Sequence, residues 1–243
     1  MTKLEVQNLT ISYEKIHVIE DISIRLYSGE IVCILGASGV GKTTLFHGIA
    51  GLITPDRGKV FLEGEDITGK SGHISYMLQK DLLLPYRTIE DNAALPLLIK
   101  GEKKREAQEK VGAYFEQFGL EGTQKKYPRQ LSGGMRQRVA LLRTYMFSKD
   151  VALLDEPFSA LDAFTKSEMH RWYLKVMNEI NLSTLFITHD IDEAILLSNR
   201  IYLLSGVPGR ILEEIVIEKT GSFLQYKTHI VECLQKTNRG MTS

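Results

Sequence analysis

The sequence contains little of what marks exported, metal-clustered or nucleic-acid-binding proteins. Its 243 residues include 2 cysteines, 1 tryptophan and 6 prolines, and 30 Lys and Arg residues balance 30 Asp and Glu residues. Cys33 and Cys233 lie too far apart for a closely spaced metal pair, and Cys33 sits in an apolar run, as a small hydrophobic residue does in a reducing compartment. A net charge of zero argues against bulk nucleic-acid binding, so we expect no nucleic-acid partner.

Long hydrophobic runs are also missing. The longest apolar runs, residues 31–35 and 151–154, have the length of strands, whereas a bilayer-spanning helix needs about 20 apolar residues. The first ten residues, MTKLEVQNLT, lack the apolar stretch of a signal peptide. A chain with 43% hydrophobic and 25% charged residues is typical of soluble globular proteins. We therefore expect a cytosolic chain that forms one domain, with room for a subdomain.

Short β-branched runs alternate with helical patterns, which predicts an α/β fold with a largely parallel sheet covered by helices. Strands are expected at residues 22–26, 31–35, 59–62, 151–154, 184–188 and 201–205, and helices at 41–50, 103–118, 166–180 and 190–197. A last strand from residue 211 and a final helix complete the pattern. Residues 85–149 show few strand signals, so we interpret them as a helical subdomain inserted between a core made of residues 1–84 and 150–243.

A glycine-rich octapeptide, Gly36-Ala37-Ser38-Gly39-Val40-Gly41-Lys42-Thr43, fits G-x-x-x-x-G-K-[ST] between an expected strand and an expected helix. Its glycines let backbone N–H groups converge on phosphate oxygens, and the helix N-terminus adds positive potential. Lys42 would reach the β- and γ-phosphates, and the Thr43 hydroxyl would bind Mg²⁺. An ordinary glycine-rich turn is the alternative, but chance produces this pattern in roughly one chain of this length in a hundred.

Two carboxylates, Asp155 and Glu156, follow the apolar run at residues 151–154. Ligands of open α/β sheets bind at this carboxyl edge of the strands. Asp155 is therefore a candidate to hold Mg²⁺, and Glu156 is a candidate to polarise an attacking water molecule. An exposed strand end without a function is the alternative, and the phosphate loop elsewhere in the chain argues against it.

A second candidate anion site lies in Leu131-Ser132-Gly133-Gly134-Met135-Arg136-Gln137-Arg138. Ser132 is a good helix N-cap, and the two glycines after it expose backbone N–H groups. When the segment is taken alone, a capped helix without a function explains it better. Its position shortly before the acidic strand end favours a functional reading.

With these three motifs the chain resembles the ATP-binding subunits of ABC transporters over nearly its whole length. The resemblance implies one P-loop NTPase cassette over residues 1–243, with a mostly parallel core sheet, an antiparallel β subdomain and the inserted helical subdomain. It also implies ATP hydrolysis in a head-to-tail homodimer, where Ser132, Gly133 and Gly134 of one copy face the ATP held by the other.

Further positions match the family one at a time. Tyr13 resembles the aromatic residue that stacks on adenine, although a strand aromatic in the core is an open alternative. Gln79 resembles the glutamine that senses Mg²⁺ and water, Asp162 lies in the loop that faces the opposing phosphate site, and His189 resembles the switch histidine. The implied catalytic residues are Glu156, His189, Gln79 and Lys42; those implied to bind ATP are Tyr13, Gly36, Ser38, Gly39, Gly41, Lys42, Thr43, Thr44, Ser132, Gly133, Gly134 and Asp162; and those implied to bind Mg²⁺ are Thr43, Gln79 and Asp155.

Segments at residues 82–86, 127–130 and 206–211 resemble importers of the nitrate, sulfonate and taurine type, a group that includes thiamine-precursor systems. This resemblance implies an integral membrane permease as partner, a solute-binding protein outside the cell, and a place on the cytoplasmic face of the membrane. Residues 82–98 either dock on the permease or pack internally. A soluble ABC ATPase without a membrane partner is the main alternative. A P-loop kinase is disfavoured because it would lack the segment at residues 131–138 and the order of Asp155-Glu156 and His189, and a GTPase because we find no guanine-reading motif.

Overall fold

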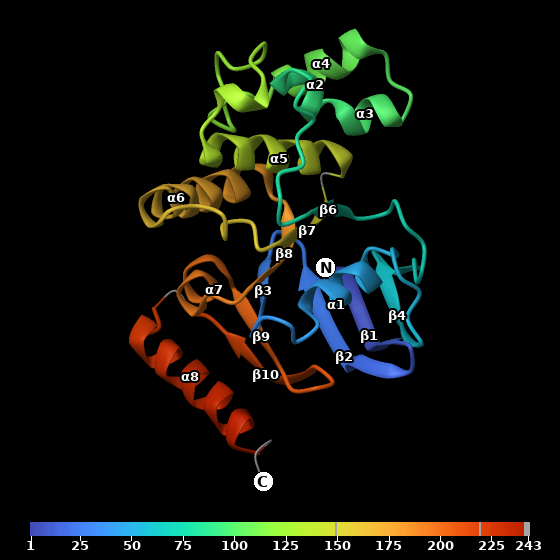
Figure 1. The fold of residues 1–243 in the computed structure, drawn as a ribbon, viewed down its shortest axis with the longest axis vertical. Helices are drawn as coiled ribbons and strands as arrows, with labels where there is room; N and C mark the ends of the chain where they lie inside the picture. Colours follow the sequence, from blue (N-terminus) through green and yellow to red (C-terminus); the bar gives the residue numbers. More distant parts are fainter. Residues whose placement is uncertain (149, 219, 241–243) are drawn as a thin grey trace. The chain divides into compact units, whose positions relative to one another are not determined.

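The computed structural model describes residues 1–148, 150–218 and 220–240, and the chain forms two compact units, Met1–His73 with Ser183–Ser243 (unit 1) and Ile74–Leu182 (unit 2) (Figure 1). Unit 1 contains β1 (Thr2–Tyr13), β2 (Ile16–Tyr27), β3 (Ile31–Leu35), α1 (Lys42–Ile49), β4 (Arg57–Leu62), β5 (Glu65–Asp66), β8 (Ser183–Thr188), α7 (Ile191–Leu197), β9 (Arg200–Ser205), β10 (Arg210–Val216) and α8 (Phe223–Gly240). Unit 2 contains β6 (Ser75–Met77), α2 (Ile89–Ala93), α3 (Leu95–Ile99), α4 (Lys104–Gly112), a 3-10 turn (Pro128–Gln130), α5 (Gly133–Phe147), β7 (Val151–Asp155) and α6 (Ala163–Ile180).

The first sheet of unit 1 is antiparallel, with strand order β2-β1-β4-β5. Its strands β1 and β2 are 12 residues long each, whereas the sequence pattern predicts only residues 22–26 of β2 and no strand in the place of β1. Glu14 and Lys15 have φ values of 49° and 71°, so they form a tight hairpin whose twist matches that of the two strands. Ile22, Ile24 and Leu26 are buried on one face of β2, while the residues between them are exposed, which is the period of two that a half-buried strand requires.

The second sheet of unit 1 has the order β10-β9-β3-β8, in which β9, β3 and β8 are parallel and β10 is antiparallel. Every residue of β3 and β8 is buried, Cys33 included, as expected for parallel strands covered on both faces. Leu35 pairs with Thr188, so the carboxyl ends of β3 and β8 lie side by side. The segments that follow them therefore start at the same edge.

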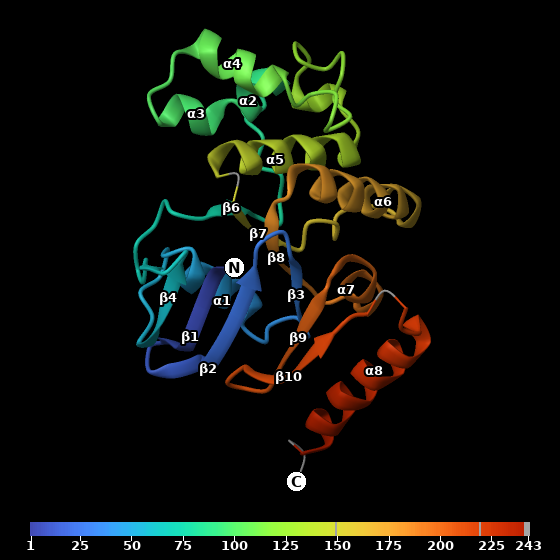
Figure 2. The ribbon, with the colours of Figure 1, turned by 180° about the vertical axis from the view of Figure 1, so that it is seen from behind.

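Two helices of unit 1, α7 and α8, lie beside one another, and α8 also contacts β9 (Figure 2). Ile230 of α8 is completely buried, and Lys227 forms an ion pair with Asp192 of α7 at 2.6 Å. These contacts attach the last helix to the rest of unit 1. Within the described residues, no helix combines the length and the apolar character that crossing a bilayer requires.

In unit 2, β6 and β7 are parallel neighbours, α5 packs against α2, α3 and α6, and the region expected to be helical, residues 85–149, lies within the unit. The prediction of one helix over residues 103–118 is wrong, because α4 ends at Gly112. Phe115 and Phe118 are fully buried in the turns that follow, and Phe118 lies 6.0 Å from the rings of both Tyr145 and Trp172. Burial of these aromatic side chains outweighs helix propensity, which is a weak preference.

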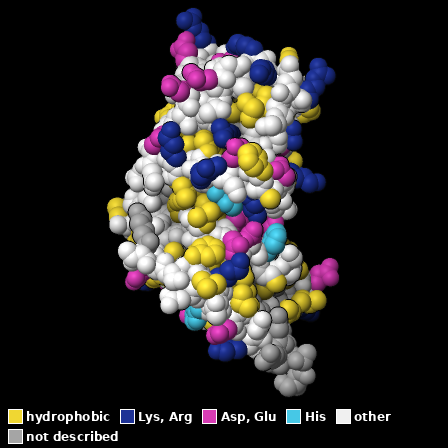
Figure 3. All heavy atoms as spheres, turned by 90° about the vertical axis from the view of Figure 1, so that its left-hand side faces the viewer, with side chains coloured by type: hydrophobic (Ala, Val, Ile, Leu, Met, Phe, Trp, Pro, Cys, Tyr) yellow, Lys and Arg dark blue, Asp and Glu magenta, His cyan; other side chains and the backbone are white. Residues whose placement is uncertain are grey.

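A charged network fastens the edge of the second sheet in unit 1. Arg200 is buried, donates to both carboxylate oxygens of Glu30, and donates to Glu214 of β10 and to the carbonyl oxygen of Arg25. On the face drawn in Figure 3, by contrast, exposed basic and acidic side chains are interspersed. Arg200 and Glu30 are 11% and 12% exposed, so this ion pair is shielded from water and is expected to contribute more to stability than an exposed pair.

We expect Arg200→Ala to lower the free energy of unfolding by about 3 kcal/mol, because it leaves the half-buried Glu30 carboxylate without its cation. This corresponds to a fall in Tm of roughly 6–12 °C for a chain of this size, measured by calorimetry or circular dichroism. Arg210→Ala is the matched control, since Arg210 pairs with Glu20 at the exposed surface and should change Tm little. Equal shifts for the two variants would contradict this assignment.

Candidate functional site

The glycine-rich loop of unit 1 joins the buried strand β3 to α1. Lys42 begins α1, yet its side chain folds back into the loop and is only 6% exposed. Its ammonium group donates to the carbonyl oxygens of Gly36 at 2.8 Å and Ala37 at 2.9 Å. A buried cation held by loop carbonyls, beside the amide groups of a helix N-terminus, makes the loop an anion-binding cradle.

Glycine is required in this loop by both sterics and backbone conformation. A Cβ at Gly36 would lie 2.5 Å from the carbonyl oxygen of Leu204, and a Cβ at Gly41 would lie 2.7 Å from Ile19 Cγ2, where φ is also +102°. The remaining predicted ligands lie along the loop and the first turn of α1, with Ser38, Gly39 and Thr43 exposed and Thr44 half-buried. The exposed Thr43 hydroxyl fits a magnesium ligand, and the glycine-lined loop fits a phosphate chain.

His189 directly follows β8 and is exposed. The amide of Gly36 donates to the carbonyl oxygen of Thr188 at 3.4 Å, so His189 begins beside the start of the phosphate loop. The hydroxyl of Thr188 donates to Glu193 at 2.6 Å and accepts from the amide of Asp190 at 3.1 Å, which orders the turn that carries the histidine. Two parallel strands thus bring the loop and the histidine to one edge.

Tyr13 ends β1 and its side chain is 46% exposed. The alternative that it is an aromatic residue of the core is therefore wrong. An exposed ring at a strand end has a free face for stacking, as an adenine contact requires.

In unit 2, the acidic strand end is also ordered. Asp155 is the last residue of β7 and is buried, and the hydroxyl of Tyr76 on the parallel strand β6 donates to its Oδ2 at 3.2 Å. Burial, and then the Asp155 charge, raise the pKa of Tyr76, so the hydroxyl keeps its proton and remains a donor. Tyr76 thereby orients a carboxylate that is suited to Mg²⁺.

Glu156 follows in the left-handed region, with φ of 44°. The side-chain amide of Gln79 donates to Glu156 Oε2 at 3.2 Å and to the hydroxyl of Ser159 at 3.3 Å. The Ser159 hydroxyl donates to the carbonyl oxygen of Glu156 at 3.0 Å. Positive φ is uncommon for a residue other than glycine and is concentrated at functional sites. The predicted pair Gln79 and Glu156 is thus brought together at the carboxyl edge of β6 and β7.

The helix α5 starts at the glycine pair of the second motif. Ser132 is exposed and caps it, since its hydroxyl accepts from the amide of Met135 at 3.3 Å. Gly134 is buried, and a Cβ there would lie 3.1 Å from Thr165 Cγ2 of α6, while a Cβ at Gly133 would lie 3.5 Å from Leu161. Asp162 caps α6 through Thr165, whose hydroxyl donates to it at 2.7 Å and holds the Asp162 pKa below its usual range. These motif residues therefore share one region of unit 2.

Sequence reasoning missed several positioning residues. Gln137 is buried in α5 and donates to the carbonyl oxygen of Pro157 at 2.7 Å, which ties the helix to the loop after Glu156. Arg143 donates to the carbonyl oxygens of Asp81 and Leu82 at 2.5 and 2.9 Å, which fastens the loop after Gln79. Gln137 lies inside the segment at residues 131–138 and Arg143 lies beyond it, but each acts on a backbone carbonyl oxygen of a distant loop, which the sequence does not reveal.

The segment at residues 206–211 also contacts the phosphate loop. A Cβ at Gly209 would lie 2.3 Å from the carbonyl oxygen of Val40, and the amide of Gly209 donates to Val18 at 2.8 Å. Gly209 thus permits a close approach of this turn to the loop. The segment at residues 206–211, which the sequence analysis used only to identify a group of importers, therefore supports the phosphate loop structurally.

Comparison with known proteins identifies relatives of this chain. A family model described as ABC transporter matches residues 19–159. The formylaminopyrimidine import ATP-binding protein of Halalkalibacterium halodurans is 46% identical over 191 residues, which covers 79% of this chain and 74% of that protein. The taurine import ATP-binding protein of Escherichia coli strain K12 is 40% identical over 221 residues, which covers 91% of this chain and 87% of that protein.

Solved structures have the same fold. A bacterial ABC transporter cassette solved as a dimer matches with a TM-score of 0.74 and 27% identity, over 88% of this chain and 99% of that chain. The same cassette in a post-hydrolysis state, bound to ADP and Pi, matches with a TM-score of 0.73 and 26% identity. The predicted mostly parallel core sheet, antiparallel β sheet and helical region are therefore confirmed as the fold class.

Proposed function

The chain belongs to the ABC transporter family of ATP-binding cassettes, and we propose that it is the subunit whose ATP hydrolysis powers uptake of a small solute through a membrane permease. ATP binding and hydrolysis follow from membership of the family. The observation that carries the uptake proposal is the identity of 46% and 40% to two relatives named for import. These relatives are named for import of formylaminopyrimidine and taurine. With the family resemblance of the sequence, they support a small solute of the nitrate, sulfonate, taurine or thiamine-precursor kind.

The nucleotide is bound by unit 1. The loop amides from Gly36 to Gly41 and the ammonium of Lys42 hold the phosphates, while Tyr13 stacks on adenine. His189 donates a hydrogen bond to the γ-phosphate from its place beside Gly36. The inward orientation of Lys42 and the exposure of Tyr13 support these roles.

The hydrolytic residues come from the carboxyl edge of β6 and β7. Mg²⁺ supplies charge neutralisation on the β- and γ-phosphates when it is bound. Thr43, Gln79 and Asp155 are the residues that would hold it, as the family resemblance implies. Glu156 polarises the attacking water, and the amide of Gln79 holds the Glu156 carboxylate in place.

A second copy of the chain completes each site in a head-to-tail homodimer with two ATP molecules. Ser132, Gly133 and Gly134 of one copy approach the γ-phosphate bound by the other, and Asp162 lies in the loop that faces the same site. Exposure of Ser132 and Asp162 supports this role, as does the dimer of the related cassette. Gly134 has a second role within its own chain, because it allows α5 to pack closely on α6.

The permease docks on unit 2, on the cytoplasmic face of the cell membrane, and a solute-binding protein outside the cell delivers the cargo. Within residues 82–98, most apolar side chains are buried, including Ile89, Ala93 and Leu97, so much of this run packs internally. Leu82 and Tyr86 are exposed, the latter by 73%, and are the docking residues of the run.

Affinity purification of the tagged chain from detergent-solubilised native membranes tests the uptake proposal. We expect a multi-span permease in near-equal amount, identified by mass spectrometry, and its associated binding protein would lead to the solute. Recovery of ribosomal, DNA-associated or other soluble partners alone, with a functional tagged chain, would support a soluble ABC ATPase and overturn the proposal.

A matched pair of variants locates the docking surface. Tyr86→Asp should reduce recovery of the permease about tenfold or more, because it places a charge in an apolar contact. Leu224→Asp is the control, since Leu224 is equally exposed, at 70%, but lies on α8 of unit 1. Equal recovery with both variants would place the permease elsewhere.

A further inference from the structure

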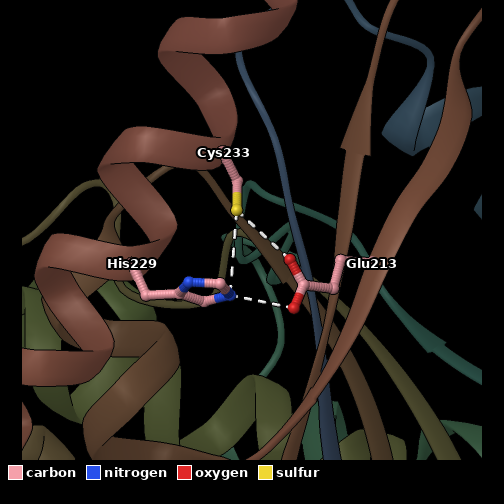
Figure 4. A group of neighbouring side chains, drawn as sticks. All are labelled: Glu213, His229 and Cys233. Atoms are coloured by element: carbon pink, nitrogen blue, oxygen red, sulfur yellow. Dashed lines mark hydrogen bonds and ion pairs between the residues drawn. The ribbon is translucent and has the colours of Figure 1, made fainter.

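Three side chains with metal-binding atoms converge between the last strand and the last helix of unit 1 (Figure 4). Glu213 comes from β10, and His229 and Cys233 come from α8. His229 Nε2 lies 2.8 Å from Glu213 Oε1, Cys233 Sγ lies 3.2 Å from Glu213 Oε2, and Sγ and Nε2 are 3.7 Å apart. Their ligand atoms all lie within 4.8 Å of one another, and none of the three belongs to the ATP site.

The spacing of these atoms matches the coordination geometry of zinc. Zinc binds Cys sulfur at about 2.3 Å and His nitrogen or Glu oxygen at about 2.0–2.2 Å, so a tetrahedral ion separates its ligand atoms by roughly 3.3–3.6 Å. His229 Nε2 and Cys233 Sγ, at 3.7 Å, already have about this separation. Glu213 offers its Oε1 to the first at 2.8 Å and its Oε2 to the second at 3.2 Å, so a rotation of the carboxylate would present one oxygen to the ion. Residues four apart on a helix share one face, which is why His229 and Cys233 both point at β10.

Charge and exposure at the cluster also fit a divalent cation. The Glu213 carboxylate faces both other groups, at 2.8 Å from His229 Nε2 and 3.2 Å from Cys233 Sγ. A carboxylate, a thiolate and a neutral imidazole together balance the two charges of Zn²⁺. The side chains of Glu213 and His229 are 39% and 48% exposed, so an ion reaches them directly from solvent.

The scaffold beneath the cluster is already in place. Ile230, next to His229, is fully buried, and Lys227 pairs with Asp192 of α7, so α8 is attached on the same side of unit 1 from which the ligands project. The backbone amide of Glu218 donates to the hydroxyl of Tyr226 at 3.0 Å, which anchors the start of the helix. Coordination therefore requires side-chain adjustment and little ordering of backbone, which favours binding.

We propose that Glu213, His229 and Cys233 form a zinc site that clamps α8 onto β10, with water as the fourth ligand. On binding, zinc displaces the hydrogen bonds among the three groups, the His229 proton moves through solvent from Nε2 to Nδ1 so that the Nε2 lone pair binds the ion, and the Cys233 thiol forms a Zn–S bond and releases its proton to solvent. The site is independent of uptake and of ATP hydrolysis.

Titration of the full, reduced, chelator-treated and nucleotide-free chain with Zn²⁺, in competition with a chromophoric chelator, tests the proposal. We expect one zinc ion per chain, and Co²⁺ in its place should give a thiolate-to-cobalt absorption band. His229→Ala and Cys233→Ser should each weaken zinc binding at least about tenfold. Zinc at about 100 times its Kd should raise Tm by roughly 5–10 °C, and this rise should vanish in both variants.

Two neighbours serve as controls. His73→Ala removes an exposed histidine of the same unit, and Glu232→Gln removes a carboxylate of α8 that is outside the cluster. Both should bind zinc as the unchanged chain does, and circular dichroism should show all variants folded. Failure of the unchanged chain to bind zinc would make the cluster a hydrogen-bonded group only, and overturn the proposal. Equal zinc affinity in His229→Ala, Cys233→Ser and the unchanged chain would also overturn it.

Discussion

Glu156→Gln is expected to slow ATP hydrolysis about 100-fold or more while ATP affinity stays within about threefold. Glutamine has the size and shape of glutamate, and its amide oxygen still accepts the hydrogen bond that Gln79 donates to Glu156. What it loses is the negative charge that polarises the attacking water. The measurement is phosphate release at saturating Mg-ATP, together with equilibrium binding of a fluorescent ATP analogue.

The same variant should accumulate as an ATP-bound dimer, because ATP hydrolysis, which opens the closed dimer, no longer takes place. Size-exclusion chromatography with light scattering, with and without ATP, detects this dimer. Glu168→Gln is the control, since Glu168 is an exposed carboxylate on α6 of the same unit. Hydrolysis at the rate of the unchanged chain in Glu156→Gln would remove Glu156 from the catalytic role.

The second large effect is expected for Lys42→Ala, which should weaken ATP binding by roughly 100-fold, or about 3 kcal/mol. Lys42 is a buried cation in the phosphate loop, with its ammonium group 2.8 Å from the Gly36 carbonyl oxygen. Its removal takes away charge-assisted hydrogen bonds to phosphate and also the hydrogen bonds that it donates to the loop carbonyl oxygens of Gly36 and Ala37. Isothermal titration with ATP, with hydrolysis prevented by omission of Mg²⁺, measures the change.

Lys59→Ala is the control for Lys42→Ala, because it removes one positive charge from the same unit without touching the phosphate loop. Lys59 lies on β4 of the same unit and pairs with Asp66 at the exposed surface. Its removal should leave ATP affinity nearly unchanged. Comparable losses in the two variants would mean that general charge, rather than the loop geometry, governs binding. The two pairs of variants also separate ATP binding from ATP hydrolysis. We expect Lys42→Ala to raise the Kd for ATP and Glu156→Gln to lower the rate of hydrolysis.

Contiguous motifs proved to be the part of the site that sequence predicts well. The loop from Gly36 to Lys42 lies between β3 and α1 as expected, and Ser132 caps α5. Each motif works through atoms only a few residues apart, so the local backbone conformation determines most of its geometry. The roles of these residues in catalysis and in the dimer stay predictions until the variants are measured.

Local sequence patterns gave wrong or incomplete predictions where packing between distant segments determines the structure. The charged pattern at residues 103–118 predicts one helix, but burial of Phe115 and Phe118 ends α4 at Gly112. Likewise, nothing near Tyr76 in the sequence indicates that its hydroxyl orients Asp155. Such contacts join residues far apart in the chain, and their geometry depends on strand register, which hydrophobic patterning does not specify in a fully buried strand.

The sequence by itself determined the fold class, the phosphate loop, the acidic strand end and membership of a family of ATPases. These are properties of short segments, in which the separation of residues along the chain determines the distances between their atoms. Only the tertiary structure placed His189 beside Gly36, set Gly209 against the loop, and brought Glu213 to His229 and Cys233. The reason is physical: side chains from separate strands and helices meet only when burial of apolar faces such as that of Ile230 fixes how those elements pack.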